Sequence, residues 1–206
     1  MPNAIRALFT DIGGVLLTNG WDRSARARAA ETFDLDLDEL NERHHLTFDT
    51  YESGKLSLEE YLHRVVFYET RAFTPGDFRG FMRAQSRPFD DIIAFQRRLK
   101  QRHGLQVLAV SNEGRELSEY RARAFGLQGL IDAFVCSGFV HVRKPDADIF
   151  RIALDLAQVE PGEVVYLDDR PMFVEVAQSL GIHGVVHRDL PGTSKAMASL
   201  GLDLPA

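Results

Sequence analysis

Cysteine and long apolar runs are scarce in this chain of 206 residues. Cys136 is its one cysteine, which excludes an internal disulfide and a cysteine-based metal site. No stretch reaches the roughly 20 apolar residues of a membrane-spanning helix, and residues 1–10 lack the apolar segment of a signal peptide. We therefore expect a cytoplasmic protein, from a reducing compartment, with no membrane partner.

Positive charge is also in short supply. The 24 Lys and Arg residues against 30 Asp and Glu residues give a formal net charge of −6. Clustered cations supply most of the affinity for nucleic acids, so we expect no nucleic acid partner. Hydrophobic residues make up 45% of the chain and include 14 Phe, and no internal repeat is visible. This composition predicts a globular protein with a sizeable apolar core.

Five short apolar runs are spaced along the chain like the strands of a buried sheet. They lie at residues 4–10, 105–110, 133–136, 164–167 and 182–186. Most are rich in Val, Leu and Ile, as parallel strands covered on both faces are. Helical patterns separate the later runs, at residues 113–125, 146–157 and 171–180. The alternation predicts an α/β fold with a Rossmann-like core, in which a parallel sheet lies between two layers of helices.

The first two predicted strands are unusually far apart. Roughly ninety residues separate them, whereas a crossover normally needs a few tens. Helical patterns fill the interval at residues 22–33, 38–50, 57–69 and 75–85, before a further helix at residues 89–102. We therefore predict an all-helical cap at residues 18–86, inserted into a core formed by residues 1–17 and 87–206.

Polar residues follow three of the predicted strands. They are Asp11 after the first, Ser111 and Asn112 after the second, and Asp168 and Asp169 after the fourth, with Lys144 in a loop. Ligand sites of open parallel sheets lie at the carboxyl ends of strands, so we expect these residues to converge. The carboxylates of Asp11 and Asp169 suit a divalent cation such as Mg²⁺. Lys144, the Ser111 hydroxyl and backbone N–H groups suit an anion.

A phosphate group is the anion that best suits this set. The carboxylates would repel it unless Mg²⁺ and Lys144 neutralised them. One charge pair at ~4 Å and an effective dielectric constant of ~20 amounts to about 4 kcal/mol, which is enough to decide between binding and rejection. We therefore expect a small phosphorylated substrate and Mg²⁺ as cofactor.

Four motifs in order resemble the haloacid dehalogenase-like hydrolases, in the branch with a helical cap after the first strand. They are LFTDIGGVL at 8–16, VLAVSNEG at 107–114, VRKPDADIF at 142–150 and VVYLDDRPMFVEVAQSLGI at 164–182. The last motif is most similar to a subgroup that holds the N-terminal phosphatase domain of epoxide hydrolases and small sugar-phosphate phosphatases. The resemblance covers nearly the whole chain.

The resemblance implies a phosphatase that acts through an aspartyl-phosphate. It implies Asp11 as the nucleophile, with Ser111 and Lys144 holding the phosphate. It also implies Asp169 as the main metal ligand with Asp168 beside it, and a cap that supplies substrate contacts.

Gly13 departs from the usual D-x-D form of the first motif. The second Asp of that form donates a proton to the leaving group and then activates water, which a glycine cannot do. The backbone carbonyl of Gly13 can still bind the metal, and members of the resembling subgroup often carry Gly there.

Three functions stay open from the sequence. The first is a Mg²⁺-dependent phosphomonoester hydrolase, and the second is a metal-independent 2-haloacid dehalogenase in which Asp11 attacks carbon. The third is a non-catalytic relative that binds a phosphorylated ligand, which Gly13 motivates. The acidic pair Asp168 and Asp169 favours the first over the second.

The same residues could also have purely structural roles. Asp11 could be a turn former, and Lys144 an ordinary solvated lysine. Ser111 and Asn112 could cap the helix that follows them, and Asp168 and Asp169 could cap the helix at Pro171.

Several other residues are candidates without a fixed role. Trp21, Arg23 and Phe48 are candidate substrate contacts from the cap. We interpret His44 and His45 as surface residues, whereas His141, three residues before Lys144, is a conceivable proton donor at the rim.

Overall fold

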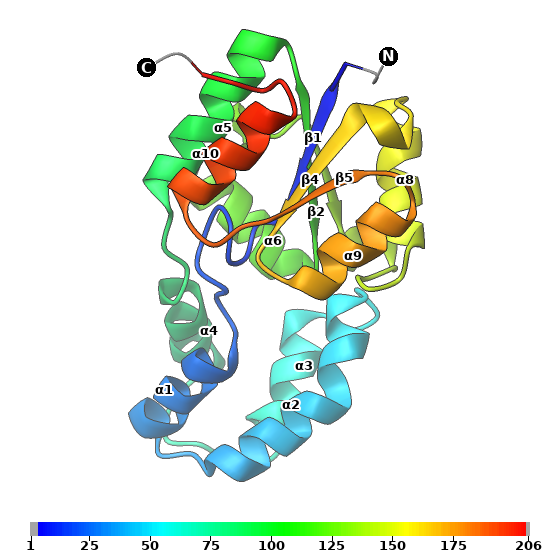
Figure 1. The fold of residues 1–206 in the computed structure, drawn as a ribbon. Helices are drawn as coiled ribbons and strands as arrows, with labels where there is room; N and C mark the ends of the chain where they lie inside the picture. The colour runs from blue at the N-terminus through cyan, green and yellow to red at the C-terminus, as the bar shows by residue number, and fades with distance from the viewer. Residues whose placement is uncertain (1–3, 205–206) are drawn as a thin grey trace.

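A parallel sheet forms the middle layer of the computed structural model, which describes residues 4–204 (Figure 1). In sequence order its strands are β1 Ala7–Thr10, β2 Gln106–Ser111, β3 Ala133–Cys136, β4 Val164–Asp168 and β5 His183–Val186. They lie side by side in the order β3-β2-β1-β4-β5, all parallel. The five predicted strands are all present, and β1 begins at Ala7 rather than at residue 4.

Helices cover both faces of the sheet, as the apolar strands require. On one face, Leu8 packs with residues of α5 (Asp90–His103) and α10 (Leu190–Ser199). On the other, Phe9 packs with residues of α8 (Asp148–Ala157) and α9 (Pro171–Ser179). Neighbouring residues of one strand thus enter two different apolar clusters, because side chains alternate across a strand. The three-layer α/β fold is confirmed (Figure 1).

Shorter helices complete the core, and one helix of full length was not predicted. The remaining elements are α6 Arg115–Ala124, η1 Leu127–Gly129, α7 Ser137–Val140 and η2 Pro161–Glu163. No helix is predicted from the sequence at α10, whose first turn contains Pro191 and Gly192. In the structure Asp189 caps that helix by accepting a hydrogen bond from the Gly192 N–H (2.7 Å), and Met197 is buried against the sheet.

Residues 18–86, which lie between β1 and α5, are mostly helical and have an apolar cluster of their own. Their helices are α1 Arg23–Phe33, α2 Leu37–Glu52, α3 Leu58–Val65 and α4 Pro75–Ala84. Ser57 and Glu60 form the predicted capping box of α3, which ends earlier than predicted. Buried residues of these helices, such as Tyr61 and Phe78, pack with one another. We call residues 18–86 the cap, and its separate cluster supports the predicted division, which stays a prediction.

The two ends of the cap lie next to each other. The Thr18 N–H donates to the Arg87 carbonyl oxygen (2.9 Å), and the Thr18 hydroxyl donates to the Gln85 carbonyl oxygen (2.7 Å). An isolated bridge pairs Leu17 with Pro88. The chain therefore leaves the core and returns to it at one point. No helix within residues 4–204 is long and apolar enough to cross a membrane.

The order of the strands fixes where a ligand site can form. After β1 the chain builds β2 and β3 on one side of it, and then β4 and β5 on the other. Ligands of such sheets bind at the carboxyl ends of the strands where the direction of building changes. In this fold that place is the end of β1, between the ends of β2 and β4, and it faces the cap (Figure 1).

Candidate active site

Asp11 lies directly after β1, at the centre of the sheet. Its backbone N–H extends the strand pairing by donating to the Leu167 carbonyl oxygen (2.8 Å). Its Oδ1 accepts a hydrogen bond from the Ile12 N–H (2.8 Å) and lies 3.2 Å from Lys144 Nζ. Burial raises the pKa of Asp11 to about 6, although Lys144 lowers it. One oxygen of the Asp11 carboxylate is therefore fixed in place, beside the positive charge of Lys144.

Lys144 is fully buried beside two carboxylates. Its Nζ donates to Asp168 Oδ2 (2.6 Å) and to the Tyr166 hydroxyl (2.9 Å), in addition to its pairing with Asp11. Burial by itself would lower the pKa of Lys144, but Asp11 and Asp168 outweigh it and the pKa is raised. The interpretation of Lys144 as a solvated lysine is therefore wrong, because it is 1% exposed.

Asp168 and Asp169 have different surroundings. Asp168 is fully buried, with Oδ2 bound to Lys144 and to the Tyr166 hydroxyl and Oδ1 accepting from the Arg170 N–H (2.7 Å). Asp169 Oδ1 is buried and has no hydrogen-bond partner among residues 4–204. Burial, together with the charge of Asp168, raises the pKa of Asp169. Neither residue caps α9 through its side chain, because Arg170 is its N-cap residue.

These three carboxylates form a cluster that fits a divalent cation. One oxygen each from Asp11, Asp168 and Asp169 can be chosen so that all three lie within 4.8 Å of one another. Lys144 offsets one negative charge of the three. A buried carboxylate oxygen without a partner is costly, and a hard cation such as Mg²⁺ takes oxygen ligands of this kind. Asp169 offers that oxygen, whereas the oxygens of Asp168 already accept three hydrogen bonds.

Ser111 is the last residue of β2 and Asn112 follows it, and the two side chains have different contacts. Ser111 is buried and lines the same cavity as Asp11 and Lys144. Asn112 Nδ2 donates to the Lys144 carbonyl oxygen (2.8 Å), and the Lys144 N–H donates to Asn112 Oδ1 (2.8 Å). The Asn112 amide thus holds the backbone of Lys144. Neither residue caps α6, whose N-cap residue is Gly114.

Gly14 lies against the acidic cluster. Its φ of +79° is in the left-handed region, and a Cβ atom there would lie 2.4 Å from the Asp169 carboxylate carbon. A side chain at position 14 would therefore displace Asp169. Gly104 has a similar φ of +64°, but a Cβ there would meet no atom within 4 Å.

The two glycines give a matched pair of variants. We expect Gly14→Ala and Gly104→Ala to lower the free energy of unfolding by a similar amount, about 1–2 kcal/mol, the cost of a left-handed residue. Displacement of Asp169 should in addition lower Mg²⁺ affinity in Gly14→Ala by about 10–100-fold. Urea unfolding and calorimetric Mg²⁺ titration measure the two effects. Equal Mg²⁺ affinity in both variants would show that Asp169 binds no cation.

A cavity of about 280 Å³ lies over this cluster, between core and cap. Its lining includes Asp11, Gly13, Ser111, Asn112 and Lys144 from the core. The cap contributes all three of its candidate contact residues, Trp21, Arg23 and Phe48. The predicted site residues Asp168 and Asp169 lie behind the cavity wall, next to Asp11 and Lys144.

His44 also lines the cavity, and its interpretation as a surface residue is wrong. Trp21 Nε1 donates to the Tyr61 hydroxyl (2.8 Å), which lies 2.7 Å from His44 Nδ1. Tyr61 thus joins Trp21 and His44 in one chain of hydrogen bonds. Burial lowers the pKa of His44 to about 3, so the ring is neutral near pH 7.

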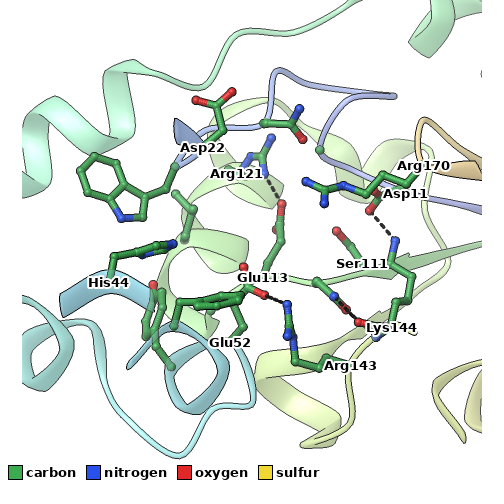
Figure 2. A pocket seen from close by; sticks show the side chains of 18 of the residues that line it. Asp11, Asp22, His44, Glu52, Ser111, Glu113, Arg121, Arg143, Lys144 and Arg170 are labelled. Carbon is green, nitrogen blue, oxygen red and sulfur yellow. Dashed lines mark hydrogen bonds and ion pairs between the residues drawn. The ribbon is translucent and has the colours of Figure 1, made fainter. Parts of the chain in front are cut away.

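Arg143 links the cap to the loop that carries Lys144. It donates to Glu52 (2.7 Å) and to Asp49, which both lie on α2. Its guanidinium carbon is 4.9 Å from the ring centre of Phe48. His141 points the same way, with Nδ1 2.7 Å from the Ser53 carbonyl oxygen. These contacts hold the C-terminal end of α2 against the core, and Figure 2 shows the one between Arg143 and Glu52.

Sequence reasoning missed a second buried ion pair in the cavity wall, between Glu113 and Arg121. Their side chains are 3% and 1% exposed and are bound to each other. Both residues line the cavity, and Figure 2 shows Glu113 pointing toward Arg121. No signal in the sequence indicates this pair: Glu113 directly follows Ser111 and Asn112, but its contact with Arg121 depends on the directions of the two side chains.

Known proteins resemble this chain in sequence over most of its length. A family model described as haloacid dehalogenase-like hydrolase matches residues 5–181. The chain is also 39% identical, over 84 residues, to the phosphorylated carbohydrates phosphatase of Thermotoga maritima. That match spans 39% of this chain and 38% of the relative, so the chain matches well under half of that protein.

Solved structures share the fold at low sequence identity. One is an HAD family enzyme from Bacteroides thetaiotaomicron, in complex with magnesium and inorganic phosphate. It has a TM-score of 0.75 and 20% identity, and the match covers 90% of this chain and 95% of that chain. Another is an HAD-like family hydrolase from Porphyromonas gingivalis, with a TM-score of 0.75, 19% identity, and coverage of 95% and 98%. Both likenesses concern the fold.

Proposed function

The chain belongs to the haloacid dehalogenase-like hydrolases, and from this membership we propose that it is a Mg²⁺-dependent phosphomonoester hydrolase acting through an aspartyl-phosphate on Asp11. One observation carries the proposal. Asp11 lies 3.2 Å from the buried Lys144 and within the acidic cluster that Asp169 completes, under a cavity of about 280 Å³. This arrangement combines a nucleophile, a fixed positive charge and a cation site.

Mg²⁺ would be held by Asp11, Asp169 and the backbone carbonyl of Gly13, with Asp168 beside them. When bound there, it supplies positive charge that offsets the repulsion between the carboxylates and the phosphate. Without the cation, the single positive charge of Lys144 does not balance the three negative charges of Asp11, Asp168 and Asp169. The dianionic phosphate would then be rejected.

The other roles in the proposed reaction belong to side chains of the protein. Asp11 Oδ2 attacks phosphorus, since Oδ1 is oriented by the Ile12 N–H. Lys144 and Ser111 bind phosphate oxygens, and Lys144 stabilises the negative charge that grows on the transferred group. Asn112, Asp168 and Tyr166 position Lys144 through the hydrogen bonds described above. Two displacements at phosphorus replace one difficult hydrolysis.

The substrate is a small phosphorylated metabolite, in keeping with the cavity volume of about 280 Å³. The named activity of the Thermotoga maritima relative supports a phosphorylated carbohydrate. Trp21, Arg23 and Phe48 are the cap residues that would contact the part of the substrate beyond the phosphate. A metal-independent dehalogenase is the alternative enzyme, and the cluster of three carboxylates disfavours it.

A screen of phosphorylated metabolites, run with Mg²⁺ and with a chelator, tests this proposal. We expect phosphate release from at least one small monoester with Mg²⁺ and none with the chelator. The same protein should release no halide from 2-haloacids. Mg²⁺-dependent binding of a phosphate ester without release of phosphate would identify the non-catalytic relative instead.

A further inference from the structure

The space beside Gly13 holds a buried guanidinium group. A Cβ atom built on Gly13 would lie 3.1 Å from Asn19 Oδ1 and 3.9 Å from Arg121 Nη1. In a D-x-D motif the side chain of the second Asp would occupy this space. Here Asn19 and Arg121 lie next to it instead. If the chain is a phosphatase as proposed, the proton that residue 13 cannot donate must come from a group in this cavity.

Arg121 is fixed on two sides. It rises from α6 and is 1% exposed. One guanidinium nitrogen, Nη1, donates to Glu113 Oε1, and the other, Nη2, donates to the Thr18 carbonyl oxygen. Thr18 is the first residue of the cap, so Arg121 joins Glu113 to the point where the cap begins. Arg121 therefore holds the Glu113 carboxyl group in one orientation.

Glu113 has one carboxyl oxygen that Arg121 leaves unused. Oε2 is buried and has no hydrogen-bond partner in the described chain, and the residue lines the cavity together with Asp11. Its backbone is also fixed, because the Glu113 N–H donates to Ser137 Oγ (3.0 Å). A buried polar oxygen without a partner is destabilising unless a proton or a ligand satisfies it.

The charged and titratable groups around Glu113 act in opposite directions. Burial raises the pKa of Glu113, Arg121 lowers it, and the charge of Asp11 raises it again. Lys144, the third charged group, lowers it. Tyr51 and Cys136 face it as well, and both are neutral because burial raises their pKa. The balance is a raised pKa, which suits a carboxyl group that both donates and accepts a proton.

The other carboxyl and imidazole groups considered as proton donors have different contacts. The His141 ring contacts the Ser53 carbonyl oxygen, and His44 is neutral with a pKa of about 3. Glu52 is bound by Arg143, and Asp22 caps α1 by accepting from the Ala25 N–H (2.8 Å). Among the described cavity residues, Glu113 keeps a carboxyl oxygen that is buried and unpaired.

We propose that Glu113 is the catalytic acid and base that replaces the missing second Asp of the first motif, with Arg121 as its positioning residue; this rests on the proposed phosphatase function. In the first step, Asp11 forms a bond to phosphorus, the bond from phosphorus to the leaving oxygen breaks, and that oxygen takes the Glu113 proton. In the second step, water attacks phosphorus and gives a proton to Glu113. The bond to Asp11 breaks, and free phosphate leaves.

Glu113→Gln tests this role, because Gln can still accept a hydrogen bond from Arg121 but cannot transfer the proton. With an alkyl monoester that the wild-type protein hydrolyses, we expect kcat to fall by about 10²–10⁴-fold. With 2,4-dinitrophenyl phosphate, whose leaving group needs no proton, the first step should continue and the second should slow. The variant should then release about one phenolate per enzyme in a burst, and acid quenching should recover phosphorylated Asp11 by mass spectrometry.

Two further variants complete the experiment. Glu119→Gln, on α6 shortly after Glu113 and partly exposed, is the matched control and should behave as wild type. Glu113→Asp keeps a carboxyl group but moves it back by one methylene group. It should therefore be more active on the alkyl ester than Glu113→Gln and less active than the wild type. Thermal unfolding shows whether Glu113→Gln folds, and Glu113→Asp replaces it in the test if it does not. In that case a Glu113→Asp enzyme with unchanged alkyl and aryl rates overturns the role.

The remaining outcomes are distinct. Equal losses on both esters without a burst would mean that Glu113 is structural, and unchanged rates would mean that it transfers no proton; either result overturns the proposal. If the wild-type protein hydrolyses neither ester with Mg²⁺ and forms no phosphorylated Asp11, the phosphatase function itself fails, and this proposal fails with it.

Discussion

Asp11→Asn should abolish phosphate ester hydrolysis, with a fall in kcat/KM on the order of 10⁶-fold, as expected when a nucleophile is removed. Asn has the same shape as Asp, and its Oδ1 can still accept from the Ile12 N–H and from Lys144. Burial raises the pKa of Asp11, so the charge that the variant removes is an unfavourable one in the folded protein. The variant should therefore be at least as stable as the wild type. Rates with 4-nitrophenyl phosphate and thermal unfolding measure both effects.

Asp91→Asn is a suitable control for this variant. Asp91, on α5, makes the same local contact, because its Oδ1 accepts from the following Ile92 N–H (2.8 Å). It is exposed and lies outside the described cavity lining. We expect wild-type activity from it. A folded Asp11→Asn protein with wild-type turnover would refute the assignment of the nucleophile.

Removal of the divalent cation should abolish activity completely, and the two neighbouring acids should respond in opposite ways. Asp169→Ala removes a carboxylate whose Oδ1 has no partner in the described residues, so it should weaken Mg²⁺ binding with little loss of stability. Asp168→Ala removes the partner of Lys144, the Tyr166 hydroxyl and the Arg170 N–H. Loss of one member of a buried ion pair costs about 3–5 kcal/mol. Asp168→Ala should therefore lower the free energy of unfolding by about that amount, with a smaller effect on Mg²⁺ affinity.

Calorimetric Mg²⁺ titration and urea unfolding in chelator separate the two effects. Gly104→Ala serves as a reference for stability, since it changes neither carboxylate. If chelator-treated protein hydrolyses phosphate esters at the full rate, the cation plays no part. The dehalogenase alternative would then gain support.

The sequence predicted the elements of the fold well where local signals were strong. Gly104 ends α5 in a left-handed conformation, and the Ser57 capping box begins α3, as expected from local chemistry. Helix α10 escaped prediction because its first turn contains Pro and Gly, and its stability depends on Met197 packing against the sheet. That contact is visible only once β5 is in place.

The candidate site was predictable only where the positions of the strand ends determine it. Asp11, Ser111 and Asp168 each end a strand, and parallel strands bring their carboxyl ends together whatever the intervening sequence. Contacts that depend on side-chain direction were not predictable. Asn112 turns its amide to the backbone of Lys144, and Glu113 pairs with Arg121 inside the cavity wall. Neither follows from spacing alone.

The shared entry and exit point of the cap bears on how the chain folds. β1 must pair with β2 across about 100 residues of chain, and closing a flexible loop of that length costs conformational entropy. The hydrogen bonds between Thr18 and Arg87 join the two ends of the cap. Once the cap has formed, its residues no longer add to the flexible length of the loop between β1 and β2. With only about 25 flexible residues left, the closure cost falls by roughly 1 kcal/mol. A cap that forms early therefore lowers the kinetic barrier to assembling the central strands, so one insertion serves the folding nucleus as well as the site.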